Sequence, residues 1–227
     1  MKYIFLVLFC ISINSFAQKP AYSLVTQSGK EMGWNSFIEQ LANADIVFLG
    51  EYHNNPICHW LEYEISSALF EKKSGKIIMG AEMFESDNQL ILDEYLNGKI
   101  KQRNFEEEAK LWNNYKTDYK PLIEFAKEKE VNFIATNIPR RYASMVAAGG
   151  FEALESLSPE AKNHIAPLPV DYDENLSCYK NMMNMGGMGG SHANANLPKA
   201  QAAKDATMAF FIIKNIKPKY TFIHYNG

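Results

Sequence analysis

Cysteine is scarce in this chain. Its 227 residues contain three cysteines, and the first of them, Cys10, lies in the apolar segment at the start. The other two, Cys58 and Cys178, give neither a framework of several disulfides nor the paired spacing of a cysteine zinc site. They could form a single disulfide, but the favoured interpretation is two buried thiols that pack as small apolar groups.

An excess of basic charge is also missing. The chain has 23 Lys and Arg against 26 Asp and Glu, so its net charge is −3, and it becomes −4 without Lys2 of the first segment. No run of consecutive basic residues is longer than two or three. A nucleic-acid partner requires a basic face, and a polybasic membrane patch requires a basic run, so neither is expected.

Long hydrophobic runs are absent beyond the first segment. Lys2 precedes an apolar stretch at 3–13, which is too short to span a bilayer, and Ser15-Phe16-Ala17 supplies the small residues that signal peptidase recognises. We therefore predict a signal peptide over 1–17 and an exported protein of the periplasm or cell envelope. The alternative is a buried N-terminal strand or helix.

The remaining sequence alternates between strand and helix patterns. Four apolar runs are predicted as strands: 45–49, 76–83, 131–136 and 219–224. Helical periodicity is predicted between them, at 57–73, 86–96, 105–112, 121–130, 140–148, 152–157, 159–164 and 198–214. Strands separated by helices, without hairpin signals, predict an α/β fold with a mainly parallel central sheet and flanking helices.

Domain organisation follows from the same pattern. Residues 18–227 are predicted to form one domain, which we expect to be C-terminally truncated because the sequence stops directly after the fourth strand. The helical stretch at 86–130 is longer than one crossover needs, so part of it is predicted to form a lid or insertion.

Residues 181–196 are rich in methionine and glycine. Such a composition does not favour a stiff element, so a mobile loop is predicted. Thioethers together with His192 suit copper or haem iron. The alternative is a flexible low-complexity insertion without a ligand.

Polar side chains follow each predicted strand. In chain order these are Glu51 and His53, then Glu82, then Arg140 and Arg141, then His224. The carboxyl ends of parallel strands share one edge of a sheet, where ligands bind in open α/β folds. We therefore expect these groups to converge.

Their chemistry suits a metal or hydrolytic site. Glu51, His53, Glu82 and His224 are predicted ligands of a divalent metal ion, since imidazole and carboxylate both bind such ions. In a hydrolase, the first three would be the catalytic groups, with a carboxylate as general base. The arginines can hold a carboxylate or phosphate.

Each group also has a structural interpretation. His53 can stabilise its loop through a hydrogen bond, and Glu82 can pair with Arg140 or Arg141. The two arginines can equally be the exposed start of a helix, and His224 can pack on a neighbour. These alternatives stay open at this point.

His59 and Glu62 lie three residues apart on the helix that follows the first strand. This spacing places them on one helical face, from which they could join the site. A solvated or core-edge position is the favoured interpretation.

Four sequence blocks in order resemble the ChaN-like haem-binding uptake proteins. The blocks are Gly50-Glu51-Tyr52-His53-Asn54-Asn55-Pro56, Gly80-Ala81-Glu82-Met83-Phe84, Asn137-Ile138-Pro139-Arg140-Arg141 and Gln201-Ala202-Ala203-Lys204-Asp205-Ala206-Thr207-Met208-Ala209. The similarity covers about 40–227. It implies an α/β fold with a mainly parallel sheet, related to the Tiki and TraB proteins and the erythromycin esterases.

The resemblance also implies a function. It implies an exported protein, often a lipoprotein of the outer membrane, that binds haem in haem or iron uptake and contacts the uptake machinery of the envelope. Haem could be shared within a homodimer, with Arg140 or Arg141 at its propionates. The candidates for the haem ligand are Tyr172, Tyr179 and His192. The related hydrolases imply the alternative, a metal-dependent hydrolase using Glu51, His53 and Glu82, so enzymatic activity is left open.

Overall fold

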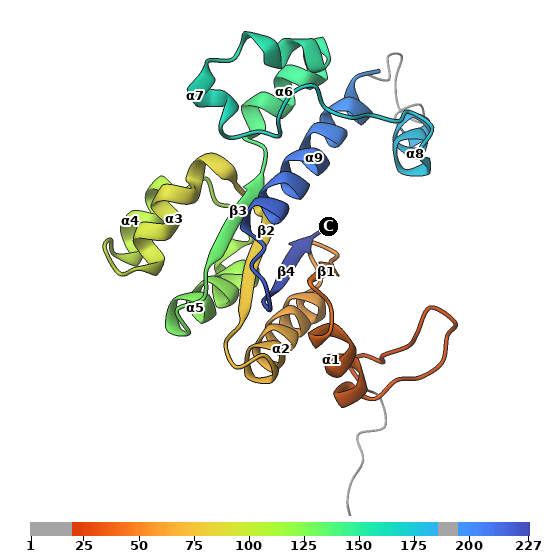
Figure 1. Cartoon of the computed structure of the whole chain (residues 1–227), viewed down its shortest axis with the longest axis vertical. Helices are drawn as coiled ribbons and strands as arrows, with labels where there is room; N and C mark the ends of the chain where they lie inside the picture. Colours follow the sequence, from red (N-terminus) through yellow and green to blue (C-terminus); the bar gives the residue numbers. More distant parts are fainter. Residues whose placement is uncertain (1–19, 186–194) are drawn as a thin grey trace, which may run out of the picture.

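A computed structural model describes residues 20–185 and 195–227 of the chain, and its centre is a four-stranded sheet (Figure 1). The strands are β1 (Ile46–Gly50), β2 (Ile77–Glu85), β3 (Phe133–Asn137) and β4 (Thr221–Asn226). Their order is β1-β4-β2-β3, and every neighbouring pair is parallel. The last of these strands in the sequence therefore lies inside the sheet, between β1 and β2.

Helices precede, connect and follow the strands. They are α1 (Trp34–Ala42), α2 (Pro56–Lys72), α3 (Gln89–Leu96), α4 (Gln102–Glu108), α5 (Lys120–Glu128), α6 (Arg140–Gly149), α7 (Pro159–Lys162), α8 (Ser177–Met185) and α9 (Leu197–Asn215). Three short turns add η1 (Ser86–Asn88), the π-helical η2 (Tyr115–Tyr119) and η3 (Phe151–Ser156). None of the helices in the described part of the chain is long and apolar enough to cross a membrane.

The two faces of the sheet pack against different helices. Met79, Ile223 and Tyr225 belong to the main core, together with residues of α2 and α5. Ile78 and Phe222 point the other way and pack with Ile212 of α9. This alternation is the period of two that a pleated strand imposes. Figure 1 shows α2 and α9 on opposite sides of the sheet.

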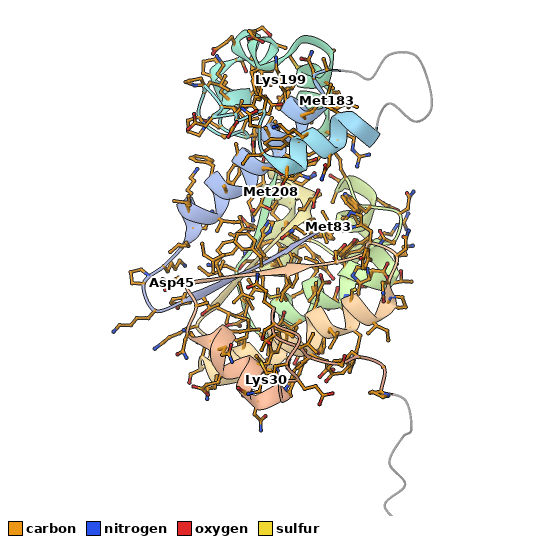
Figure 2. All side chains as sticks on the ribbon, turned by 90° about the vertical axis from the view of Figure 1, so that its right-hand side faces the viewer. Lys30, Asp45, Met83, Met183, Lys199 and Met208 are labelled. Carbon is orange, nitrogen blue, oxygen red and sulfur yellow. The ribbon has the colours of Figure 1, made fainter. Side chains whose placement is uncertain are left out.

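A second, smaller core lies beyond the carboxyl ends of the strands. It contains buried apolar residues of α6, η3 and α9, among them Val146, Leu154 and Ala203. In Figure 2, Met83 lies at the sheet, Met208 lies further up on α9, and Met183 lies on α8 near the upper end of the molecule. The long α9 thus runs from the main sheet to this second core.

The predicted α/β class is confirmed, and each of the four predicted strands is found within two residues of its expected bounds. The region predicted as a lid or insertion forms α3, α4 and α5, which bury Leu92, Phe105 and Ile123 in the main core. It is therefore an integral insertion.

Three local features differ from what the sequence predicts. Helix α1 was not predicted from the sequence. Residues 181–185 belong to α8 rather than to a loop, and 186–194 lie outside the described residues. Cys58 and Cys178 are both free thiols, and Cys178 is exposed rather than buried. The predicted signal peptide lies outside the described residues.

Candidate functional site

The candidate site is built around Glu51, the first residue after β1. Val47 and Leu49 face the main core, and the backbone N–H of Glu51 still donates to the carbonyl of Asn226 at 2.9 Å. The strand geometry therefore continues one residue further, and its alternation turns Glu51 toward the same face. Its side chain is completely buried beneath the start of α2.

Two donors hold one carboxylate oxygen of Glu51. The Tyr119 hydroxyl donates to Oε1 at 2.6 Å, and Nδ1 of His53 lies 2.6 Å from the same oxygen. Both distances are typical of short hydrogen bonds to a carboxylate. Glu51 therefore fixes the orientation of the His53 imidazole.

Helix α2 brings two further polar side chains to Glu51. Its start is defined by Asn55, whose side chain accepts from the N–H groups of Ile57 and Cys58, and by Pro56 in the first turn. From there His59 and Glu62 point inward, and both are almost fully buried. The expectation that they are solvated or at the core edge is corrected.

The two nitrogens of His59 face different partners. Nδ1 lies 3.2 Å from Oε2 of Glu62 and 3.5 Å from Oε2 of Glu51. Nε2 lies 3.1 Å from the backbone carbonyl of His53 and 3.6 Å from Oδ2 of Asp118. The imidazole thus bridges a pair of buried carboxyl groups and the loop that carries His53.

Burial governs the protonation of this cluster. Desolvation, followed by the neighbouring Glu51, raises the pKa of Glu62 to about 10, so Glu62 holds a proton at neutral pH in the absence of another cation. Desolvation and the hydrogen bond to Glu51 raise the pKa of Tyr119 well above its usual value, so its hydroxyl remains a donor.

His53 also faces a surface cleft. About 43% of its side chain is exposed, and its ring meets Trp112 edge-on at 4.9 Å between centroids. The cleft has a volume of about 380 Å³ and is lined by Leu111, Trp112, Asn114 and Arg140 as well as His53. Its wall combines the apolar side chains of Leu111 and Trp112 with an imidazole and a guanidinium.

Glu82 is connected to the His53 region by Gly227. Its Oε2 accepts a hydrogen bond from the Gly227 N–H at 3.1 Å, and Gly227 packs directly against the His53 ring. Glu82 and His53 therefore both contact Gly227.

The two arginines have different environments. Arg141 donates to Asp87 at 2.5 Å and lies over the ring of Tyr142. Burial alone would raise the pKa of Asp87, but hydrogen bonds from Arg141 and Lys110 hold it below its usual value. Arg140 is 76% exposed and, in the described part of the chain, reaches Glu85 only at 4.0 Å, so it is the arginine better placed to meet a ligand. Neither arginine pairs with Glu82 in the described part of the chain.

His224 does not join Glu51. It is buried on the α9 face of the sheet, where Nε2 lies 2.8 Å from the Thr136 hydroxyl and the ring contacts Phe48. Its neighbour Tyr225 points to the α2 face and meets Ser66, so alternation directs His224 away. Burial lowers the pKa of His224 to about 4.

The predicted metal ligands are consequently not assembled as one group. Among the described residues, the His, Cys, Asp and Glu side chains close enough to share an ion are Glu51, His59 and Glu62, whose ligand atoms all lie within 4.8 Å of one another. Of the predicted set, Glu51 belongs to this group, whereas His53 contacts Glu51 from the cleft side.

Two of the predicted haem ligands, Tyr172 and Tyr179, lie in or near α8. Tyr179 is buried and its hydroxyl donates to Asp205 at 2.9 Å, while the Tyr172 ring packs between Phe151 and Tyr179. His192 lies outside the described residues.

One sequence signal could have identified His59 and Glu62 as residues of the site. On α2 the buried positions include His59, Glu62, Ser66 and Leu69, a spacing of three and four residues that marks the face toward the sheet. Polar residues at the start of that stripe indicate a buried polar site. Asn114 and Tyr119 gave no comparable signal, because they lie just before and within the short π-helical turn η2 rather than on a regular helix or strand.

Comparison with known proteins gives the chain a family. A family profile described as haem-binding uptake, Tiki superfamily, ChaN matches residues 37–227. The chain belongs to the ChaN family. No curated protein matches this ChaN-family chain significantly.

Among solved structures, the ChaN-family fold is also found in ChaN of Campylobacter jejuni, which binds haem cofacially. The TM-score is 0.64 at 17% sequence identity, and the match covers 88% of this chain and 76% of that one. At this identity the likeness shows a shared fold.

Proposed function

We propose that this protein binds haem and serves haem or iron uptake in the cell envelope. The observation that carries the proposal is membership of the ChaN haem-binding uptake family, with a match over residues 37–227. The predicted signal peptide over 1–17 supports an exported location. A homodimer that shares haem between its subunits is part of the proposal, by analogy with the cofacial haem of the Campylobacter jejuni protein.

The cleft beside His53 has the chemistry that haem requires. Leu111 and Trp112 offer apolar surface to a macrocycle, and the exposed Arg140 can pair with a propionate. His53 contributes its half-exposed ring to the cleft wall, with Nδ1 engaged by Glu51 and Gly227 against the Nε2 side. When bound, haem would supply an iron centre that an imidazole or phenolate can ligate.

Titration of the purified protein with hemin tests the proposal. We expect a saturable shift of the Soret band at micromolar haem, and His53→Ala should alter its position or affinity. Arg140→Gln should weaken binding by about 5- to 10-fold, corresponding to about 1 kcal/mol for an exposed ion pair. Arg103→Gln, a change at an exposed arginine of α4, is the control. The absence of any saturable shift would refute haem binding.

Sedimentation with and without hemin tests the shared-haem homodimer. Haem-dependent dimers are expected, whereas a monomer at saturating haem would exclude shared binding.

A hydrolytic function is the second candidate, and the 2.6 Å contact between Glu51 and His53 favours it. A buried carboxylate that orients an imidazole in a cleft is an arrangement found in general-base catalysis. Turnover of a panel of aryl esters and peptides, lost in His53→Ala, would support it. No turnover above the buffer rate would exclude it for those substrates.

A further inference from the structure

We propose that Glu51, His59 and Glu62 form a binding site for one divalent transition-metal ion, next to the haem cleft and linked to it by the contact of Glu51 with His53. The three ligand atoms lie within 4.8 Å of one another, and they come from the end of β1 and two consecutive turns of α2. Two rigid elements therefore hold the group in place.

The distances between the ligand atoms fit a single small ion. Nδ1 of His59 lies 3.2 Å from Glu62 Oε2 and 3.5 Å from Glu51 Oε2. Nitrogen and oxygen ligands bind Zn²⁺ at about 2.0–2.2 Å, which places tetrahedral ligand atoms roughly 3.3–3.6 Å apart. Both distances from the imidazole to the carboxylates lie close to this spacing, and the whole group lies within 4.8 Å.

The tautomer of His59 points the same way. Its Nε2 lies 3.1 Å from the His53 carbonyl, which can only accept, so Nε2 carries the hydrogen. In a neutral imidazole, Nδ1 then presents a lone pair toward both carboxyl groups. Metal-ligating histidines donate their other N–H to a carbonyl or carboxylate in this way, and Asp118 adds a carboxylate 3.6 Å from Nε2.

Two carboxyl oxygens in the group are buried without a partner. They are Oε2 of Glu51 and Oε1 of Glu62, neither of which has a hydrogen-bond donor in the described structure. The side chains are 0% and 4% exposed, respectively. In the described part of the chain, the ion pairs of both glutamates involve histidine and no lysine or arginine. Buried anions of this kind require a cation or a proton between them.

The ligand types select the class of ion. One imidazole and two carboxylates suit Zn²⁺, Mn²⁺ or Fe²⁺, and three protein ligands leave a position for water. A surface cleft of about 370 Å³, lined by His59, Asp118 and Thr117 among others, offers a path from solvent to the imidazole.

Zn²⁺ binding to the full chain tests the proposal. We expect one Zn²⁺ per chain, measured by chelator competition and by metal analysis after dialysis. Glu62→Gln keeps the shape of the side chain but removes its charge, and it should weaken binding more than about 100-fold, since even partners of metal ligands contribute 10- to 100-fold. Glu64→Gln, two residues along α2, lines the outer cleft and should leave the affinity unchanged.

Co²⁺ loading of the wild-type protein gives a second measurement that does not depend on a variant. Visible absorption bands of a four- or five-coordinate Co²⁺ with a nitrogen ligand are expected, and Zn²⁺ should displace them. A folded Glu62→Gln that binds Zn²⁺ like wild type, or a wild type that binds neither ion, overturns the site in favour of a shared proton. Hemin titration of the same variants reports haem binding independently.

Discussion

The environment of Glu51 depends on one phenolic hydroxyl. Tyr119 and Tyr115 both belong to η2, but the Tyr119 hydroxyl donates to Glu51 at 2.6 Å, whereas the buried Tyr115 hydroxyl has no hydrogen-bond partner in the described structure. The two tyrosines therefore form a matched pair for a single-atom change.

We predict that Tyr119→Phe lowers the free energy of unfolding by about 1.5–3 kcal/mol, the usual contribution of a hydrogen bond to a charged group. Tyr115→Phe should cause no loss, because it removes an unsatisfied hydroxyl. Urea denaturation measures both. Equal losses in the two variants would show that Glu51 gains nothing from the Tyr119 hydroxyl.

His224 makes stability depend on acidity. Burial lowers its pKa to about 4 from an ordinary value of 6.5, so the unfolded chain binds a proton in this range that the folded chain does not. The contribution of His224 to stability is therefore complete above pH 6.5 and is lost as the pH falls toward 4.

We predict a decrease of at most about 1.4 kcal/mol per pH unit from this group over that window. Denaturation midpoints between pH 7 and pH 4 measure it, and His224→Gln should flatten the dependence. An unchanged slope in the variant would assign the effect to other groups.

At the residue scale, the sequence predicts which side chains close along the chain contact each other better than it predicts which face of a helix or strand a side chain occupies. The Glu51–His53 pair was expected and lies in contact at 2.6 Å. His59 and Glu62 were expected in a solvated or core-edge position, although the three- and four-residue spacing along α2 places them on the face toward the sheet. His224 was expected at the same edge, but whether it points to α2 or α9 depends on packing that its own residue type does not reveal.

Among the elements, the Phe222 ring of β4 packs against β2 at Gly80, which has no side chain. A Cβ added at Gly80 would lie 2.8 Å from two ring atoms of Phe222 and 3.2 Å from the carbonyl of Ile134. Phe222 is fully buried and has little room to move.

We predict that Gly80→Ala destabilises the protein by about 1–3 kcal/mol through overpacking. Gly50→Ala, at the end of β1, meets nothing within 4 Å and should not destabilise it. Thermal unfolding compares the two variants. Similar melting temperatures would mean that the Phe222 ring relaxes freely.

Apolar strands were predicted well, whereas the methionine-rich α8 was missed. The strands were recognised because a parallel sheet buries both faces and leaves continuous apolar runs, as in β2. Helix α8 was missed because its Met-rich sequence lacks the usual signals, and it is held instead by contacts such as Tyr179 with Asp205. Tertiary contacts of this kind are not visible in a local pattern.

At the scale of the whole molecule, two apolar cores are connected by α9. All three tryptophans, Trp34, Trp60 and Trp112, precede the segments that form the second core, whereas Val146 is fully buried within it. Tryptophan emission therefore reports on the main core, and circular dichroism reports on both.

We predict that Val146→Ala weakens the second core by about 2 kcal/mol. The midpoint from far-UV circular dichroism should fall, while the midpoint from tryptophan emission stays close to that of wild type. Coincident shifts of both signals would show that the molecule unfolds as one cooperative unit.

The position of β4 has a consequence for biosynthesis. Residues 221–226 occupy the slot between β1 and β2, so those two strands have no direct hydrogen bonds to each other. On the ribosome, β1 has no partner strand and β2 has only β3 until that segment has emerged. The nascent chain must therefore carry open strand edges until residues 221–226 have emerged, which makes it a substrate for chaperones that shield unpaired strands.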